Sequence, residues 1–343
     1  MAKISVGLDI GVSSIKVVAL SKDNSSFKLV SLGSIKTPSP GLSSDSDLDL
    51  EAVAAAIKKL FQAAKIQEKE IVCALPESKV FTRVIDDLPY LSDSELAPAI
   101  RYAAEEFIPL PISEVNLNWQ VLSRAPDKKG KTIVFVVASP KNLVQKYIRV
   151  LSLADLKPKA LETEIIAATR SLASLNPFSP TSLIIQMGSA TTDFAVVSKG
   201  LIILTRSIST GGSALTRALA QGFNFESSQA EEYKKVYGLL SDQLEGKVFN
   251  VLKSTVDVIL EEARRVIQSY LGKNPQNPIK RVVLSGGGAK LPGLVIYMAN
   301  FLGLEVQEAD PWYFISKEKT AKTSLTRDGT FYSVAVGLAL RED

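Results

Sequence analysis

Two short stretches of the sequence combine glycine, hydroxyl side chains and aspartate as phosphate-binding turns do. The first reads GLDIGVSSIK at residues 7–16. Glycine permits a tight hairpin whose backbone amides approach phosphate oxygens, and Ser13 and Ser14 can add hydroxyl donors. Asp9, at the end of a predicted strand, can hold the water shell of Mg²⁺, which prefers oxygen ligands and keeps its waters. An ordinary hairpin is the competing interpretation of this stretch taken alone.

The second stretch reads QMGSATTD at residues 186–193 and repeats the pattern of the first. Its Gly188, Ser189 and Thr191 would supply a facing phosphate clamp. An ordinary hairpin is again the alternative, but the repetition favours a phosphate site for both stretches.

Two more motifs suit the nucleoside part of a nucleotide. Residues 284–293 read LSGGGAKLPG, and three glycines between a predicted strand and a predicted helix let the backbone contact a flat ligand or a phosphate. A generic turn is the alternative, although three glycines directly after a buried strand are costly. In AEEYKKVYG, residues 230–238, Glu231 and Lys234 share a helix face and can bond ribose hydroxyls and an adenine edge. Taken alone, this pair reads as an exposed ion pair.

Composition limits the available chemistry. The 343 residues include no histidine and one cysteine, Cys73. The first fact excludes Ser–His and Cys–His nucleophiles and histidine metal sites, and the second indicates a reducing compartment. No signal peptide is visible, and no uncharged apolar run approaches the roughly 20 residues of a membrane span. We therefore expect a cytoplasmic protein whose catalysis, if any, uses carboxylates, lysines, hydroxyls or a metal–nucleotide.

The basic excess is concentrated in two runs. The formal net charge is +4, and residues 124–131 and 317–322 hold much of the excess of basic over acidic residues. Aromatic residues interleave neither run, so we expect no nucleic-acid partner. Solvated loops are the preferred interpretation, and attraction to an anionic inner-leaflet surface is the alternative.

Hydrophobic periodicity predicts the elements that position these motifs. A strand–turn–strand unit at 5–20 recurs at 182–198, which predicts a duplicated, two-lobed α/β architecture. The stretch 80–158 reads as a small α+β insertion. Predicted strands lie at 3–9, 15–21, 27–35, 71–75, 115–122, 132–139, 182–187, 194–197, 201–207 and 281–285. Predicted helices lie at 50–64, 92–107, 143–153, 213–222, 227–237, 248–271 and 331–340.

Together the four motifs resemble the actin, sugar-kinase and chaperone ATPase superfamily, in which they occur in this order. Within it, the segments AEEFIP at 104–109 and SVAVGLALR at 333–341 are similar to the PilM family of type IV pilus assembly proteins, which is related to FtsA. The resemblance covers nearly the whole chain. It implies an actin-like ATPase fold, with two lobes, a duplicated core and a small α+β inserted subdomain. The implied divisions are a first lobe at 1–79 and 159–180, a partner-binding insertion at 80–158, a second lobe with a nucleotide-binding helical insertion at 181–330, and a C-terminal helix at 331–343.

The resemblance also implies that the chain binds ATP and Mg²⁺, with Asp9 holding the metal through water. The family's second hairpin usually opens with aspartate, but here the residue is Gln186, which carries no charge. Asp193 lies too far along the turn to replace the missing aspartate at position 186, so we expect at most slow ATPase activity. Glu164 lies near the position of a water-orienting residue in related ATPases, and is the candidate catalytic residue. The expected nucleotide-binding residues are Asp9, Gly11, Ser13, Ser14, Lys16, Gly188, Ser189, Thr191, Gly211, Gly212, Glu231, Lys234, Gly286, Gly287 and Gly288.

The implied function is a cytoplasmic ATP-binding platform for type IV pilus assembly or related type II secretion. Its implied partner is the N-terminal cytoplasmic peptide of a PilN-like inner-membrane protein, bound between the first lobe and the insertion. That partner, with other pilus components, would recruit it to the cytoplasmic face of the inner membrane. An FtsA-like cell-division filament protein is one alternative, although such proteins usually add a C-terminal amphipathic membrane helix and this sequence ends at Asp343. A small-molecule kinase is another, without a convincing motif for its carboxylate base.

Overall fold

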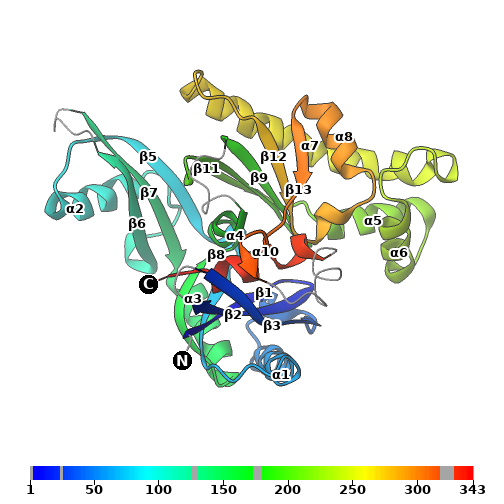
Figure 1. Cartoon of the computed structure of the whole chain (residues 1–343), viewed down its shortest axis with the longest axis horizontal. Helices are drawn as coiled ribbons and strands as arrows, with labels where there is room; N and C mark the ends of the chain where they lie inside the picture. Colours follow the sequence, from blue (N-terminus) through cyan, green and yellow to red (C-terminus); the bar gives the residue numbers. More distant parts are fainter. Residues whose placement is uncertain (1–2, 24–25, 125–129, 173–179, 317–327, 343) are drawn as a thin grey trace.

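The computed structural model describes residues 3–23, 26–124, 130–172, 180–316 and 328–342. The basic run at 317–322, and most of the run at 124–131, lie outside these residues. Within the described residues the strands form three sheets, one in each of two lobes and one in an inserted subdomain (Figure 1).

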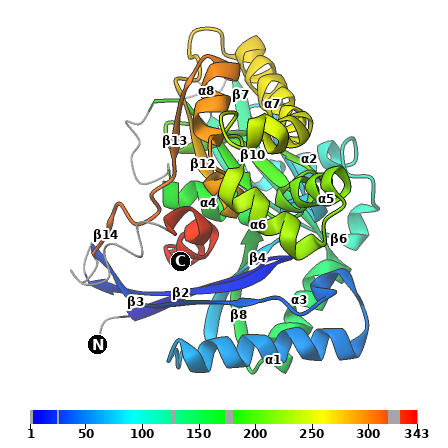
Figure 2. The same cartoon turned by 90° about the vertical axis from the view of Figure 1, so that its right-hand side faces the viewer.

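The first lobe is built on a sheet with the strand order β14-β3-β2-β1-β4-β8. Its strands are β1 (Lys3–Ile10), β2 (Ser14–Asp23), β3 (Ser26–Lys36), β4 (Glu70–Leu75), β8 (Lys157–Thr163) and β14 (Ile315–Ser316). The helices α1 (Asp47–Ala63) and α3 (Lys141–Leu153) cover one face, and α4 (Glu164–Leu172) and α10 (Ser333–Ala339) cover the other. Figure 2 shows α1 and α10 on opposite sides of this sheet.

Cover on both faces explains why β1 and β4 are almost continuously apolar and buried. It also explains Gly7, because a Cβ there would lie 2.2 Å from the carbonyl oxygen of Ala335 in α10. The end of α10 is held by a buried carboxylate: Glu162 accepts hydrogen bonds from Arg170 and from Arg341, the latter at 2.6 Å.

The second lobe has the strand order β11-β10-β9-β12-β13. Its strands are β9 (Ser182–Met187), β10 (Thr192–Ser198), β11 (Leu201–Ile208), β12 (Arg281–Ser285) and β13 (Glu305–Glu308). Its helices are α5 (Gly212–Phe223), α6 (Ser227–Tyr237), α7 (Lys247–Lys273) and α8 (Leu294–Leu302). In both lobes an antiparallel meander pairs its first strand in parallel with a later strand, β1 with β4 and β9 with β12. The predicted duplication is therefore present.

The inserted subdomain contains β5 (Phe81–Pro89), β6 (Val115–Arg124) and β7 (Lys131–Pro140), in the order β5-β7-β6, with α2 (Asp93–Ala104) on one face. The capping box predicted from Ser92 and Glu95 is formed at the start of α2. The subdomain also reaches the second lobe, since the hydroxyl oxygens of Thr82 in β5 and Thr205 in β11 lie 2.7 Å apart.

Two expected boundaries differ from the arrangement of the sheets. The helix α3 packs in the core of the first lobe through Tyr147 and Val150, and β8 pairs with β4, so residues 141–163 belong to that lobe. We therefore propose that the insertion ends at Pro140 instead of 158. Similarly, β14 pairs with β3 and Trp312 is buried beside β2, so we end the second lobe near Glu308 instead of 330.

Among the helices of the described residues, none combines the length and apolarity needed to span a bilayer.

Candidate functional site

A cleft of about 1470 Å³ lies between the lobes and gathers the residues that the motifs singled out. Every predicted nucleotide-binding residue lines it except Gly211, and Glu164 lines it too. Gly211 lies behind the second hairpin instead, where a Cβ would be 2.7 Å from the carbonyl oxygens of Gly188 and Ser189. Close packing under the hairpin therefore explains why residue 211 is a glycine.

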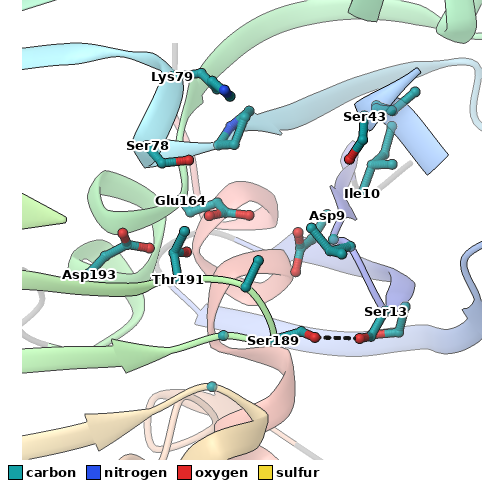
Figure 3. A pocket seen from close by; sticks show the side chains of 18 of the residues that line it. Asp9, Ile10, Ser13, Ser43, Ser78, Lys79, Glu164, Ser189, Thr191 and Asp193 are labelled. Atoms are coloured by element: carbon teal, nitrogen blue, oxygen red, sulfur yellow. Dashed lines mark hydrogen bonds between the residues drawn. The ribbon is translucent and has the colours of Figure 1, made fainter. Parts of the chain in front are cut away.

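The two hairpins have the same closing hydrogen bond and face each other across the cleft. Gly11 N–H donates to Ser14 O at 3.1 Å, and Gly188 N–H donates to Thr191 O at 2.9 Å. The tips meet where Ser13 Oγ donates to Ser189 Oγ at 2.6 Å (Figure 3). Amides and hydroxyls from both lobes therefore converge on one place, as a phosphate clamp requires.

Two buried oxygens in this region have no hydrogen-bond partner in the described part of the chain. Asp9 is 3% exposed; its Oδ2 accepts from Lys16 Nζ at 2.7 Å, but its Oδ1 is unpaired. Gln186 is 8% exposed, and its Oε1 is likewise unpaired. An unpaired buried polar atom costs about 1–3 kcal/mol, so these oxygens are suited to accept bonds from a ligand or its water shell.

This donor set fits Mg²⁺ held through water. Carboxylate and amide oxygens are the hard ligands that Mg²⁺ prefers, and the ion commonly keeps several waters when it binds with phosphates. Among the described residues no group of three or more Asp, Glu, Cys or His side chains could enclose an ion directly. The site can therefore share a hydrated metal with phosphates, but it is not an all-protein cage.

Asp193 lies closer to the hairpin chemistry than its sequence position indicates. It pairs directly across the β9–β10 ladder from Gln186 and lines the cleft. Its Oδ1 accepts a hydrogen bond from Ser207 at 2.6 Å. Burial, followed by the charge of Glu77, raises the pKa of Asp193 to about 7. The expectation that Asp193 is too remote to compensate for Gln186 is thus weakened, because the hairpin folds the two positions together.

Glu164 begins α4 and lies between Asp9 and Asp193 on the floor of the cleft (Figure 3). Burial, together with the charges of Asp9 and Asp193, raises the pKa of Glu164 well above its usual value. Sequence reasoning missed Glu77, which is 4% exposed and accepts from Thr82 Oγ1 at 3.1 Å. Burial raises the pKa of Glu77 to about 7. Burial and the neighbouring carboxylates thus favour the neutral form of Glu164, whereas nearby positive charge would favour the carboxylate that can act as a base.

The three glycines of the third motif have different roles. A Cβ on Gly286 would lie 2.3 Å from Met187 O, and a Cβ on Gly288 would lie 2.4 Å from the Met187 side chain. Both positions are thus required for close packing of the turn against β9. At Gly287 the nearest atom, Phe331 Cδ2, would be 3.6 Å away, so this position alone leaves space on the cleft side.

Glu231 and Lys234 form a fixed pair and are not a loose surface ion pair. Lys234 Nζ donates to Glu231 Oε2 at 2.6 Å and to Thr216 Oγ1 at 2.9 Å, and it also reaches the carbonyl of Gly212 at 3.1 Å. Burial opposes ionisation of Glu231, but the bonds from Lys234 and Thr216 outweigh it and lower the pKa of Glu231. These bonds hold the Glu231 and Lys234 side chains in one orientation in the cleft.

The cleft continues beyond the first hairpin into a groove between the first lobe and the inserted subdomain. Its total volume exceeds the roughly 300–1,000 Å³ of most small-molecule sites. One wall is fixed by Lys146, whose Nζ donates to Leu42 O at 3.2 Å and pairs with Asp45 at 2.5 Å. The residues lining this groove are Pro40, Leu42, Ser43, Asp45, Ser78, Lys79, Leu110, Ser113, Glu114, Lys141, Asn142, Gln145 and Lys146.

Comparisons with known proteins agree with this geometry. A family model described as type IV pilus assembly protein PilM matches residues 7–343. Among solved structures, the chain is similar to one titled a PilM–PilN type IV pilus biogenesis complex, with 27% identity, 98% of each chain covered and a TM-score of 0.86. MreB5 of Spiroplasma citri bound to ADP is 15% identical, with 98% of this chain and 94% of that chain covered and a TM-score of 0.54. Its likeness concerns the fold alone.

Among curated proteins, cell division protein FtsA of Bacillus subtilis (strain 168) is 22% identical over 356 residues, covering 90% of this chain and 79% of FtsA. FtsA of Enterococcus hirae is 24% identical over 343 residues, covering 88% of this chain and 77% of its own length. The solved structures confirm the expected actin-like fold.

Proposed function

Because the match over residues 7–343 shows that this chain belongs to the PilM family of type IV pilus assembly proteins, we propose that it is a nucleotide-binding platform of that assembly. One observation carries the proposal: a single continuous cleft joins the two hairpins, the glycine turn and the Glu/Lys pair to a groove beside the inserted subdomain. A small ligand and a partner segment thus have adjoining places.

The small ligand of this proposal is ATP with Mg²⁺. The hairpin amides and the hydroxyls of Ser13, Ser189 and Thr191 would bind the phosphates, while Glu231, Lys234 and the glycine turn would bind the nucleoside. Asp9 would hold the metal through water, with Gln186 or Asp193 as the second acceptor. Bound Mg²⁺ would supply charge stabilisation to the transferring phosphoryl group. With one anionic hairpin position replaced by an amide, the proposed turnover is slow.

The partner is proposed to be the N-terminal cytoplasmic peptide of a PilN-like membrane protein. The similar solved structure is titled a PilM–PilN complex, and here the groove offers apolar, amide and charged side chains to an extended segment. Such a partner, with other pilus components, would recruit the protein to the cytoplasmic face of the inner membrane.

Nucleotide binding is tested by thermal unfolding with Mg²⁺–ATP. A ligand that binds only the folded state at 100 times its Kd stabilises it by about 2.7 kcal/mol. Gly287→Leu should remove the shift, because its side chain enters the proposed nucleoside space. Gly272→Leu is the matched control, since a Cβ there meets nothing within 4 Å. An unchanged shift in Gly287→Leu would show that the nucleoside lies elsewhere.

Partner binding is tested by calorimetry with the peptide. Gln145→Trp fills the groove, and we expect it to weaken binding at least about tenfold. Ile148→Trp, at a 44% exposed position of the same helix outside the groove, should bind normally. Full-strength binding by Gln145→Trp would move the peptide site to another surface.

An FtsA-like filament protein remains the second candidate, favoured by the FtsA relatives at 22–24% identity. Such a protein would form sedimentable, ATP-dependent filaments. If this chain sediments with ATP and fails to bind the PilN-like peptide, that candidate replaces the first.

A further inference from the structure

Phe331 is an aromatic residue in the nucleotide half of the cleft, and none of the four motifs contains it. It belongs to a short 3₁₀ turn, η7 (Gly329–Tyr332), that leads into α10. Among the described residues lining the cleft, the aromatic side chains are Phe331 and Tyr147. Tyr147 is only 3% exposed, whereas Phe331 is half-buried. Phe331 therefore supplies the aromatic surface that a ligand in the cleft can touch.

The Phe331 ring lies between the first phosphate hairpin and the glycine turn. Its Cδ2 is 3.6 Å from the place that a Cβ of Gly287 would take. Lys16 Nζ lies 4.7 Å from the ring centroid while it pairs with Asp9. A nucleotide with its phosphates at the hairpins and its nucleoside at the glycine turn would lie beside this ring.

The ring is also held in place before a ligand arrives. Gly286 N–H donates to Thr330 O at 2.9 Å, which ties η7 to the glycine turn. The neighbouring Tyr332 ring meets Phe331 edge to face at 5.1 Å and packs against buried Trp312. A surface fixed in this way loses little conformational freedom on binding.

We propose that the Phe331 ring is the apolar contact surface for the nucleoside of a bound purine nucleotide, and that Lys16 leaves the ring for the phosphates when the nucleotide binds. This inference rests on the proposed function, because it names a further contact within the same site. Lys16 contacts Asp9 and the ring, and a bound polyphosphate would offer its ammonium group several charged oxygen acceptors. Base–aromatic stacking commonly changes affinity tenfold or more.

The test is calorimetry with Mg²⁺–ATP on ring-deleting and ring-retaining variants. We expect Phe331→Leu to weaken ATP binding about tenfold and Phe331→Tyr to stay within about twofold of wild type. Phe331→Met repeats the deletion in case the leucine variant folds poorly. Phe314→Leu is the control, because that 45% exposed ring pairs with Tyr313 outside the cleft.

Inorganic triphosphate separates nucleoside contact from an effect on Lys16. It should compete with ATP analogues equally well for wild type and Phe331→Leu, since it has no nucleoside. Full ATP affinity in Phe331→Leu, or an equal loss for triphosphate, would overturn the inference while leaving nucleotide binding intact. A wild-type protein that binds no ATP would overturn the proposed function itself.

Discussion

Replacing Gln186 with aspartate would add a carboxylate to the floor of the cleft, and the β9–β10 pairing sets the size of its effect. Residue 186 lies directly across from Asp193. Side chains opposite one another in an antiparallel pair have Cβ atoms about 5 Å apart, and two unit charges at that distance repel by about 3 kcal/mol at an effective dielectric constant of about 20. Gln186→Asp should therefore lower the free energy of unfolding of the ligand-free protein by up to about 3 kcal/mol at pH 8.

The penalty should shrink in acid. Because burial raises the pKa of Asp193 to about 7, this carboxyl is mostly neutral at pH 6, and the repulsion then largely disappears. Gln186→Asn is the matched control, since asparagine has the length of aspartate without its charge. A Gln186→Asp variant as stable as Gln186→Asn at pH 8 would show that the two positions do not interact.

The added carboxylate should also tighten Mg²⁺-dependent binding of ATP. A carboxylate accepts charge-assisted hydrogen bonds worth about 1.5–3 kcal/mol, so the Mg²⁺ concentration for half-maximal binding should fall about tenfold in Gln186→Asp. Calorimetry and steady-state ATPase assays with Mg²⁺ titrated measure both consequences, and we expect slow wild-type turnover. Brisk wild-type hydrolysis, with a Gln186→Asp variant unchanged in metal dependence and rate, would refute the weakened-metal argument.

Three further predictions follow from the packing and the buried charges. Burial raises the folded-state pKa values of Glu77 and Asp193 to about 7, so these groups stabilise the fold at low pH and lose that contribution as the pH rises through about 7. In a Glu77→Gln/Asp193→Asn variant, the melting temperature should therefore change less between pH 5 and pH 8 than in the wild type. A profile like that of the wild type would contradict the raised pKa values. Gly288→Ala should lower the free energy of unfolding by about 1–3 kcal/mol, because the new Cβ would collide with the Met187 side chain, whereas Gly287→Ala should cost almost nothing. Denaturant unfolding measures both values, and equal losses would be evidence against this geometry. Glu162→Gln should lower stability by about 3 kcal/mol, because it leaves two arginines without their buried counter-charge, and a loss below 0.5 kcal/mol would mean that water replaces the pair.

Local signals in the sequence were sufficient for many elements of this fold. The glycine-containing turns, the strands on either side of them and the Ser92/Glu95 capping box were predicted and are present. These features depend on neighbours in the chain, because turn conformation and strand alternation are decided within a few residues. The order of the motifs likewise identified the actin-like fold.

Elements that depend on distant partners were less accessible. No strand was predicted at 81–89, 157–163 or 305–308, although β5, β8 and β13 lie there. Each is the edge strand of its sheet, so its pairing is decided by a single neighbour elsewhere in the chain. The boundary that we propose at Pro140 in place of 158 has the same origin, since α3 is assigned to the insertion until its burial against the first lobe is known.

The division between sequence and tertiary structure is clearest at the cleft. The sequence by itself determined which chemistry is available, since it supplies two glycine–hydroxyl hairpins, a glycine turn and a Glu/Lys helix, and contains no histidine. Only the tertiary structure decided which distant side chains meet: Ser13 of the first hairpin contacts Ser189 of the second, and Phe331 comes beside Lys16. The reason is that side-chain types follow from local composition, whereas distances across a cleft are fixed by how two separate sheets pack around shared helices.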